Sequence, residues 1–374
     1  MTNLFMVIGI TGWIALLASI YVYKKIKEER LKSITIEEKQ SSDPKVVVIG
    51  GGTGQSVFLR GLKKKTQNIT AVVTVADDGG GSGVLREDLG MLPPGDIRNC
   101  LLALANIEPT MREVMQYRFT EGALKGQSFG NLFLAAMNGL YGNFEVALYK
   151  MSQIFAITGK VLPVSLDDIN LIAELKNGKI VKGESKIPIQ CKKDKTSIKR
   201  VYLDKPDATP LEDVINSIEN ADIIIMGPGS LYTSIIPNLL LKGVVEAIEK
   251  SKAPKVYICN IMTQPGESDN YNVLDHVNTI VNHTDKNIID YVISNNEVLP
   301  KIMLERYQKD GSTQVLLDEN QKKSLKIMGA KTIEENLIEI KSNYIRHDAS
   351  HISDIVINLA LRHNNDKKLS KEGF

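Results

Sequence analysis

The sequence Lys-Val-Val-Val-Ile-Gly-Gly-Gly-Thr-Gly-Gln-Ser, residues 45–56, decides the fold. Residues 45–49 form a short β-branched run, which is typical of a buried parallel strand. The glycines of residues 50–54 follow directly, and an apolar stretch with helical spacing comes next. A strand, a glycine turn and a helix in this order indicate a phosphate-binding loop, because glycines let backbone N–H groups approach a phosphate at a helix start.

The glycine loop matches no common phosphate-binding motif completely. Gln55 stands where the dinucleotide motif G-x-G-x-x-G has its last glycine, and no Gly-Lys-Ser/Thr follows as in a P-loop. The next predicted strand ends at Asp77, 23 residues after Gly54 and close to the position of the ribose-binding acid in dinucleotide folds. A tight strand–helix turn without a ligand is the alternative. The predicted ligand contacts in this loop are Gly51, Gly52, Thr53 and Gly54.

A second glycine-rich loop, Gly79–Gly83, comes directly after the paired carboxylates Asp77 and Asp78. Such a loop is costly to order, so ligand binding explains it better than a simple connection does. The two carboxylates could hold Mg²⁺ through oxygen ligands, or they could bind ribose hydroxyls. The sequence leaves both possibilities open.

Two helix starts follow in this half. We expect Asp96 to be the N-cap of a helix that begins after the Pro-Pro-Gly sequence of residues 93–95. Ser128 is the expected cap of a later helix. Asn131, in the first turn of that helix, either points at a ligand or supports the loop.

The C-terminal half repeats the α/β pattern. Predicted strands at residues 221–226, 255–259 and 291–296 each end in polar or glycine-rich sequence. Ligands of open α/β sheets bind beyond the carboxyl ends of the strands, so we expect one crevice fed by both halves. Its predicted residues from this half are Gly227, Gly229, Ser230, Asn260 and Thr263. Residues 166–204 are predicted to be a small β-rich insertion, with an Asn-Gly hairpin turn at residues 177–178 and an exposed turn at 192–195.

The N-terminal segment has a different character. Residues 4–23 carry no charge and match the roughly 30 Å hydrocarbon core of a membrane. No basic residue precedes them, which argues against a signal peptide, and the Lys24-Lys25 pair follows them. We therefore predict an anchor in residues 1–23, a polar linker in 24–44, a nucleotide-binding body in 45–351, and a C-terminal helix and polar tail in 352–374. The body would lie in the cytoplasm, tethered to the inner face of the membrane.

Charge and cysteine content exclude several classes of protein. The chain of 374 residues has 46 basic and 44 acidic residues. Residues 1–30 hold four of the basic and two of the acidic ones, which leaves 42 of each sign in the rest. A neutral body does not suit nucleic-acid binding, which depends on clustered basic charge. The three separated cysteines suit neither a disulfide framework nor a zinc site of their own.

Seven phrases along residues 45–351 together resemble one family. They are GGGTG (50–54), ADDGGGSG (76–83), PPGDIRN (93–99), FGNLFLAAM (129–137), MGPGSLYTSIIPNL (226–239), NIMTQPGESDNY (260–271) and RHD (346–348). This pattern resembles the gluconeogenesis-factor (YvcK-like) family, which is related to the 2-phospho-L-lactate transferase (CofD-like) fold. The chain departs from the family pattern at Gly81, Val84 and Gln127, where the family usually has serine, arginine and histidine.

The resemblance implies a Rossmann-like, three-layer α/β/α body with a mostly parallel sheet. It also implies a regulator of carbon flux into cell-envelope precursors that is needed for cell shape during gluconeogenic growth. The implied ligand is a UDP-sugar, notably UDP-N-acetylglucosamine, with Tyr271 matching the family's uridine-binding tyrosine and Arg306 its binding arginine. A partner among the enzymes of amino-sugar synthesis and assembly into a homo-oligomer are further expectations.

Three functions compete at this stage. A nucleotide-sugar sensor is favoured, because the sequence has no obvious pair of base and nucleophile. A phosphoryl-type transferase that uses Mg²⁺ at Asp77 and Asp78 is the alternative. A dinucleotide enzyme is disfavoured by Gln55. We therefore predict no catalytic residue.

Overall fold

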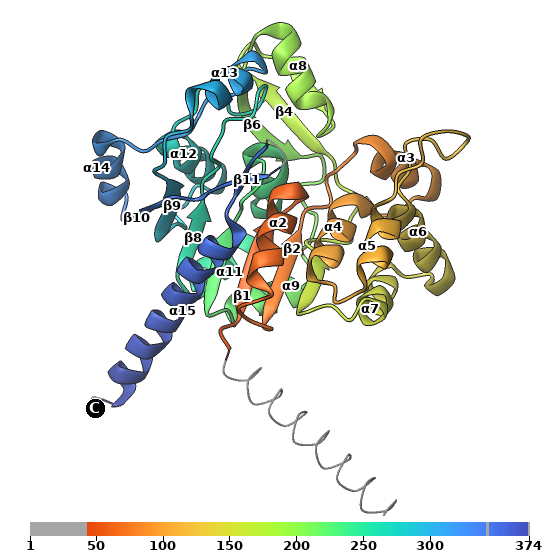
Figure 1. Cartoon of the computed structure of the whole chain (residues 1–374), viewed down its shortest axis with the longest axis horizontal. Coiled ribbons are helices and arrows are strands. Elements are labelled where there is room, and N and C mark those ends of the chain that lie inside the picture. The colour runs from red at the N-terminus through yellow and green to blue at the C-terminus, as the bar shows by residue number, and fades with distance from the viewer. Residues whose placement is uncertain (1–42, 342–343, 373–374) are drawn as a thin grey trace, which may run out of the picture. The chain divides into compact units, whose positions relative to one another are not determined.

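The computed structural model describes residues 43–341 and 344–372 (Figure 1). Residues Pro44–Phe374 form one compact unit. The predicted anchor of residues 4–23 and nearly all of the linker lie outside the described residues and stay predictions. Within the described part of the chain, no single helix is long and apolar enough to cross a membrane. One pair of helices, Leu231–Leu239 and Val244–Lys250, has the length and composition together but is bent by 74°.

The centre of the body is a seven-stranded sheet in which every neighbouring pair of strands is parallel. Its order is β10-β9-β8-β7-β1-β2-β3. The strands are short runs, and β1, β7 and most of β2 and β8 are buried on both faces, as parallel strands covered by helices are. This confirms the predicted α/β fold. The strand bounds are β1 Val46–Gly50, β2 Ile69–Val73, β3 Lys160–Pro163, β7 Ile223–Met226, β8 Lys255–Ile258, β9 Tyr291–Asn295 and β10 Lys331–Glu335.

Helices cover the sheet on both faces. In Figure 1, α2 (Gly52–Leu62), α4 (Pro94–Leu104) and α15 (Ala349–Glu372) pack together in front of the sheet. The helices α9 (Glu212–Glu219), α11 (Val244–Lys250) and α12 (Val273–Thr284) lie behind it, with the short elements η1 (Leu231–Ile235) and α10 (Ile236–Leu239). The C-terminal helix begins three residues before the predicted boundary, because Asp348 caps it by accepting hydrogen bonds from the N–H groups of Ser350 and His351.

The remaining elements lie around the rim of the sheet. The helices α3, α5, α6 and α7 gather beside β3. Along the chain, α13 and α14 lie between β9 and β10, and the antiparallel pair β11–β12 follows β10. Ser128 caps α6 as predicted, since its side chain accepts from the N–H of Asn131. The bounds are α3 Gly80–Leu89, α5 Pro109–Gln116, α6 Phe129–Tyr141, α7 Phe144–Ile154, α13 Lys301–Lys309, α14 Glu319–Ile327, β11 Ile338–Lys341 and β12 Tyr344–His347.

The predicted insertion is a separate three-stranded antiparallel sheet. It comprises β4 (Leu171–Leu175), β5 (Ile180–Lys182), α8 (Lys186–Asp194) and β6 (Ile198–Leu203), with strand order β5-β4-β6. The Asn-Gly hairpin is confirmed: Gly178 has φ +85° between β4 and β5. The stretch at 192–195 is not a free turn but the end of α8, where Lys195 takes the left-handed conformation.

Gln55, the residue that departs from the dinucleotide motif, has a structural role. Its side chain is fully buried, and its Nε2 donates to the carbonyl oxygens of Val48 (2.9 Å) and Val72 (3.1 Å). The glutamine therefore ties β1 to β2 and fills the space that the last glycine of that motif leaves for close helix–strand packing.

Candidate functional site

Two glycine loops meet at the point in the sheet where the chain reverses the direction in which it adds strands. The chain leaves β1 toward β2 and leaves β7 toward β8, so the β1–β7 pair is the topological switch point at which open α/β sheets bind ligands. The loops approach so closely that a Cβ on Gly54 would lie 2.7 Å from the carbonyl oxygen of Pro228. Gly229 lies against the first loop in the same way, since its Cβ would come 3.3 Å from the Gly51 oxygen.

A cleft of about 490 Å³ opens beside these loops, and we name it the switch-point cleft. This volume is within the range of small-molecule sites, roughly 300–1,000 Å³. The structure brings eight of the predicted site residues together along its wall: Gly51, Gly52, Thr53, Gly54, Gly229, Ser230, Asn260 and Thr263. Residues of the β11–β12 pair and of α13 complete the wall, namely Tyr307, Tyr344, Ile345, Arg346 and His347.

A short polar network links the two later loops across the cleft. Gln264 Nε2 donates to Ser230 Oγ over 2.7 Å, and Asn260 Nδ2 donates to Gln264 Oε1 over 3.4 Å. Thr263 is joined to the next segment by its hydroxyl, which lies 3.2 Å from the hydroxyl of Thr313. Gln264 is not among the predicted site residues, although it lies in the polar stretch that follows β8.

Asp96 is the main addition to the predicted site. It is not the N-cap of α4, because Pro93 holds that position and Asp96 lies in the first turn. Its carboxylate instead reaches the glycine loop, where it accepts a hydrogen bond from the N–H of Gly52. A Cβ on Gly51 would lie 2.9 Å from Asp96 Oδ2. The start of α2 therefore already has a carboxyl partner, and a phosphate must use the remaining N–H groups of the loop.

Asp96 belongs to an acidic cluster, defined as Asp77, Asp78, Asp96, Glu184 and Glu267. Burial raises the pKa of Asp96 to about 7, with Asp77 adding to the rise. Burial likewise raises the pKa of Glu184 to about 8, and the other four carboxylates add to it. Burial raises the pKa of Glu267 to about 7 as well. Near neutral pH some of these groups carry a proton that they can donate to a ligand hydroxyl.

The insertion contributes to this cluster. Asp78 Oδ1 accepts from the N–H of Ser185 over 2.8 Å, which fixes the turn between β5 and α8 over the end of β2. A Cβ on Gly183 would lie 2.3 Å from Asp78 Oδ2. Asp78 therefore positions the insertion, and the insertion in turn brings Glu184 to the cluster.

The paired aspartates are a partial fit for a metal. No group of three His, Cys, Asp or Glu side chains in residues 43–341 and 344–372 is arranged to hold a metal ion. Asp77 Oδ1 accepts from the N–H of Gly79 over 2.8 Å, and Asp78 Oδ1 is used by Ser185. Mg²⁺ is commonly held by one or two carboxylates together with ligand phosphates and water. Asp77 and Asp78 could supply such carboxylates to a Mg²⁺ ion that arrives with a phosphate ligand, but they do not form a complete metal site of protein groups alone.

Two of the remaining predicted residues are buried outside the switch-point cleft. Gly227 is buried below the second loop with φ +84°. Asn131 is only 3% exposed, and its Oδ1 has no hydrogen-bond partner among the described residues. Neither one lines the switch-point cleft.

Tyr271 does not line the switch-point cleft either. Its hydroxyl lies 2.6 Å from the hydroxyl of Tyr232, and its ring meets that of His276 edge-on at 5.5 Å. The tyrosine is half-buried and packs against the main core. Its predicted contact with uracil remains a prediction.

Arg306 does not line the switch-point cleft itself but contacts Tyr344, which does. Its guanidinium carbon is 5.2 Å from the ring centre of Tyr344, and Arg346 approaches the same ring at 5.5 Å. Tyr344 and Arg346 both line the cleft and are exposed. Next to them, burial lowers the pKa of His347 to about 4, so this imidazole is neutral at pH 7 while its Nε2 lies 3.1 Å from the Cys259 oxygen.

Fold and site define a class: a parallel α/β protein with glycine loops at its switch point and a small-molecule cleft beside them. Residues 46–338 match the sequence model of the family described as 2-phospho-L-lactate transferase CofD. This match covers most of the chain, which therefore belongs to the CofD family.

Relatives within the family carry a more specific name. A Bacillus subtilis protein named gluconeogenesis factor is 45% identical over 317 residues, which are 84% of this chain and 98% of its own. A Thermoanaerobacterium thermosulfurigenes protein whose name contains the same words is 60% identical over 316 residues, 84% of this chain and 97% of its own. A crystal structure of a Bacillus halodurans protein has a TM-score of 0.80 at 45% identity and covers 84% of this chain and 100% of its own.

Proposed function

We propose that the switch-point cleft binds a UDP-sugar, notably UDP-N-acetylglucosamine, and that the protein regulates carbon flux into cell-envelope precursors. In this proposal the protein is needed for cell shape during gluconeogenic growth, and it acts by contacting an enzyme of amino-sugar synthesis. The observation that carries the proposal is the meeting of two glycine loops with the Asn260–Gln264 network in one cleft. The naming of the relatives supports the link to gluconeogenesis.

The chemistry of the cleft supports a ligand with phosphates and hydroxyls. Glycine loops offer backbone N–H groups to phosphate oxygens. The acidic cluster next to Gly51 suits sugar hydroxyls, because carboxylates accept from them and protonated carboxyls donate to them. Arg346 at the opposite wall suits the negative charge of a diphosphate.

Calorimetric titration of residues 43–374 with UDP-N-acetylglucosamine, GDP and NAD tests the proposal. We expect saturable binding of the UDP-sugar and a loss of about tenfold in Asn260→Ala, because one polar contact in a cleft is worth about 1–2 kcal/mol. Asn365→Ala, an exposed change on α15, is the matched control and should bind as the unchanged protein does. Binding of GDP alone, with no heat from the UDP-sugar, would overturn the proposal.

A transferase resembling 2-phospho-L-lactate transferase is the second candidate. The description of the matched family favours it, and so do the raised pKa values of Asp96 and Glu184, which suit proton transfer near neutral pH. Asp77 and Asp78 would hold Mg²⁺ on the phosphates of the nucleotide in that case. Turnover of a nucleotide diphosphate donor that stops in Asp77→Asn would favour the transferase over the sensor.

Tyr271 gives a prediction that separates packing from ligand binding. We expect Tyr271→Ala to lower the melting temperature, because it removes the contacts with Tyr232 and His276. If the ring also stacks on uracil, affinity for the UDP-sugar falls 5- to 150-fold, by analogy with base stacking worth roughly 1–3 kcal/mol. Tyr271→Phe keeps the ring and loses only the hydroxyl contact, so it should bind normally. Unchanged affinity in both variants would remove Tyr271 from the site.

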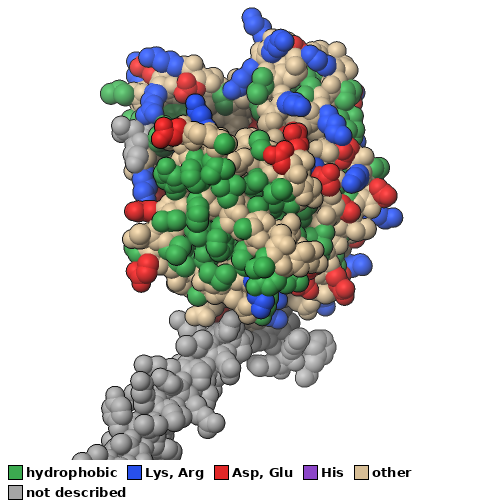
Figure 2. Space-filling model, turned by 90° about the vertical axis from the view of Figure 1, so that its right-hand side faces the viewer, with side chains coloured by type: hydrophobic (Ala, Val, Ile, Leu, Met, Phe, Trp, Pro, Cys, Tyr) green, Lys and Arg blue, Asp and Glu red, His purple; other side chains and the backbone are tan. Residues whose placement is uncertain are grey.

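The proposed homo-oligomer has a surface that suits it. Figure 2 shows apolar side chains gathered on the side of the molecule where α5, α6 and α7 lie. We name this the apolar face and define it by Met111, Val114, Leu140, Tyr141, Val146, Tyr149 and Ile154, all of them more than 40% exposed. Exposed apolar patches of this kind mark interaction sites in soluble proteins.

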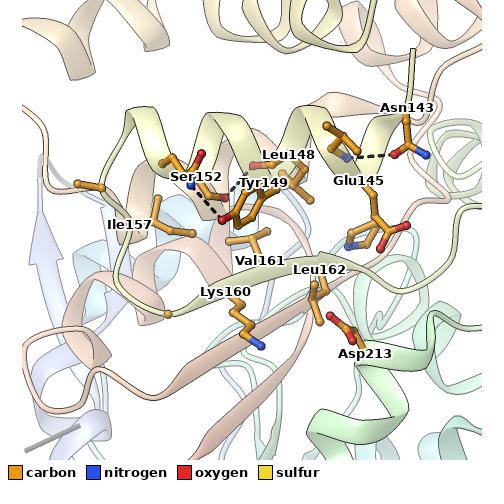
Figure 3. Close-up of a pocket in the computed structure, with 15 residues that line it drawn as sticks. Asn143, Glu145, Leu148, Tyr149, Ser152, Ile157, Lys160, Val161, Leu162 and Asp213 are labelled. Carbon is orange, nitrogen blue, oxygen red and sulfur yellow. Dashed lines mark hydrogen bonds between the residues drawn. The ribbon is translucent and has the colours of Figure 1, made fainter. Parts of the chain in front are cut away.

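A groove of about 800 Å³ runs between α7 and the edge strand β3 on the same side (Figure 3). Leu148 and Tyr149 face Val161 across it, and Lys160 and Asp213 lie at its border. A second copy of the chain suits this groove, because a two-fold interface uses the same patch on both subunits and would cover the edge strand β3.

We expect Leu140→Glu with Tyr149→Glu to shift the protein from dimer to monomer in light scattering coupled to size exclusion. Ile327→Glu on α14 is the control, since Ile327 is 88% exposed and lies outside the apolar face. A protein that is a monomer before any change at 100 μM would contradict this part of the proposal.

A further inference from the structure

A second cavity, of about 660 Å³, lies on the outer side of α2. Its walls come from α2, the residue Arg112 of α5, the β11–β12 pair and the start of α15. The start of α15 is held tightly against α2, because a Cβ on Gly61 would lie 2.3 Å from the Ala349 oxygen. The cavity is therefore a fixed part of the body.

Positive charge is concentrated in this cavity, which we name the basic pocket. Six basic side chains line it: Arg60, Lys63, Lys64, Arg112, Lys341 and Arg346. Glu339 and Asp348 are its acidic lining residues, and Asp348 already caps α15. Since residues 31–374 are neutral as a whole, this local excess is a property of the pocket and not of the surface in general.

The basic groups repel one another, and Lys63 Nζ and Arg112 Nη2 share one partner, the backbone oxygen of Ala105 at the end of α4. Burial lowers the pKa of Arg60, and Arg112 lowers it further. Burial also lowers the pKa of Lys63, and the positive charges of Arg112, Arg60 and Lys64 lower it further. The Nε of Arg60 is buried without a hydrogen-bond partner among the described residues.

Within the same described part of the chain, neither Arg60 nor Arg112 forms an ion pair. A protein that gathers like charges in a concave site, at a cost to its own stability, has the electrostatics of an anion-binding site.

We propose that the basic pocket binds a small phosphorylated metabolite through a phosphate or diphosphate group. Guanidinium groups match phosphate oxygens with paired N–H donors, which makes Arg60 and Arg112 the central contacts. The concave shape suits a small ligand better than a flat macromolecular surface does. Thr53, Tyr344 and Arg346 line both the basic pocket and the switch-point cleft, so an anion in the pocket acts on the wall of the cleft.

Calorimetry with inorganic pyrophosphate as the probe tests this proposal in 50 mM salt. We expect binding to the unchanged protein and at least tenfold weaker binding to the double variant Arg60→Gln, Arg112→Gln. The control Lys176→Gln, Lys193→Gln removes two exposed positive charges from the insertion and should bind pyrophosphate normally. The melting temperature of the Arg60 and Arg112 variant should change little, because the loss of mutual repulsion offsets the loss of the hydrogen bond from Arg112 Nη2 to the Ala105 oxygen.

Asn260→Ala distinguishes the basic pocket from the switch-point cleft. We expect this variant to bind pyrophosphate normally, whether or not its affinity for the UDP-sugar falls. The proposal for the basic pocket can therefore fail while the proposed function of the cleft stands, and the proposed function can fail while the pocket still binds pyrophosphate. Equal pyrophosphate binding by the Arg60 and Arg112 variant and the unchanged protein would overturn it. Loss of pyrophosphate binding in Asn260→Ala alone would overturn it too, since the anion would then occupy the cleft.

Discussion

Gly54→Ala should weaken UDP-sugar binding by about 10- to 100-fold. The new Cβ would lie 2.7 Å from the Pro228 oxygen and 3.1 Å from the Gly229 Cα, both of them backbone atoms that cannot turn aside. The two glycine loops must therefore move apart, and the phosphate site between them opens. Overpacking of this kind costs about 1–3 kcal/mol, so the melting temperature should fall as well. Titration calorimetry and thermal unfolding measure the two effects.

Gly139→Ala is the matched control for this change. Gly139 also lies inside a helix, α6, but a Cβ there would meet no atom within 4 Å. Helix propensity alone predicts that alanine stabilises such a position by up to about 1 kcal/mol. If Gly54→Ala behaved like Gly139→Ala in both measurements, the close contact between the loops would have no role in binding.

Glu184→Gln should stabilise the unliganded protein at pH 8.5 and change little at pH 4.5. Burial and the neighbouring carboxylates raise the pKa of Glu184 from 4.5 to about 8. Between these two pH values the unfolded chain holds fewer protons at this residue than the folded protein does, so folding stability falls as pH rises. Glutamine resembles the protonated form and has no such dependence.

The size of this effect follows from the pKa shift. One pKa unit corresponds to 1.36 kcal/mol, which sets an upper bound of about 5 kcal/mol at high pH. Contact of the half-buried carboxyl with solvent reduces the expected gain to about 2 kcal/mol. Urea unfolding at pH 4.5 and 8.5 measures it, with the exposed Glu219→Gln as control. An equal gain at both pH values would mean that packing, and not ionisation, is responsible.

The predicted parts of the fold are those that depend on neighbours in sequence. The β-branched run before Gly50 and the apolar run at 221–226 are typical of buried strands between helices, and they contain β1 and β7. The Asn-Gly turn at 177–178 also sets its own geometry. The glycine loops meet because both follow parallel strands, whose carboxyl ends lie at one edge of the sheet.

The missed residues owe their roles to contacts between distant segments. Gln55 looks like a flaw in a glycine motif until β2 lies beside β1 and supplies a second carbonyl. Asp96 has the sequence of a cap, but the packing of α4 against α2 turns it toward Gly52. Glu184 reaches the acidic cluster only because Asp78 fixes the insertion, a contact between residues 107 positions apart.

The basic pocket also depends on contacts between distant segments. Its residues come from three regions of a chain with balanced charge, and the basic run Lys63-Lys64-Lys65 marks only one of the three. The Arg-His-Asp phrase at 346–348 does carry a signal, since it supplies a wall of both cavities and the cap of α15. The phrase reaches the basic pocket only because the β11–β12 pair places Arg346 next to α2.

A crystal structure of the protein with UDP-N-acetylglucosamine is the most direct test of the central claim. We expect electron density for the diphosphate between the loops Gly51–Gly54 and Gly229–Ser230, with the ligand extending along Asn260 in the switch-point cleft. Density for the diphosphate in the basic pocket or in the groove beside β3, with the switch-point cleft empty at saturating ligand, would contradict it.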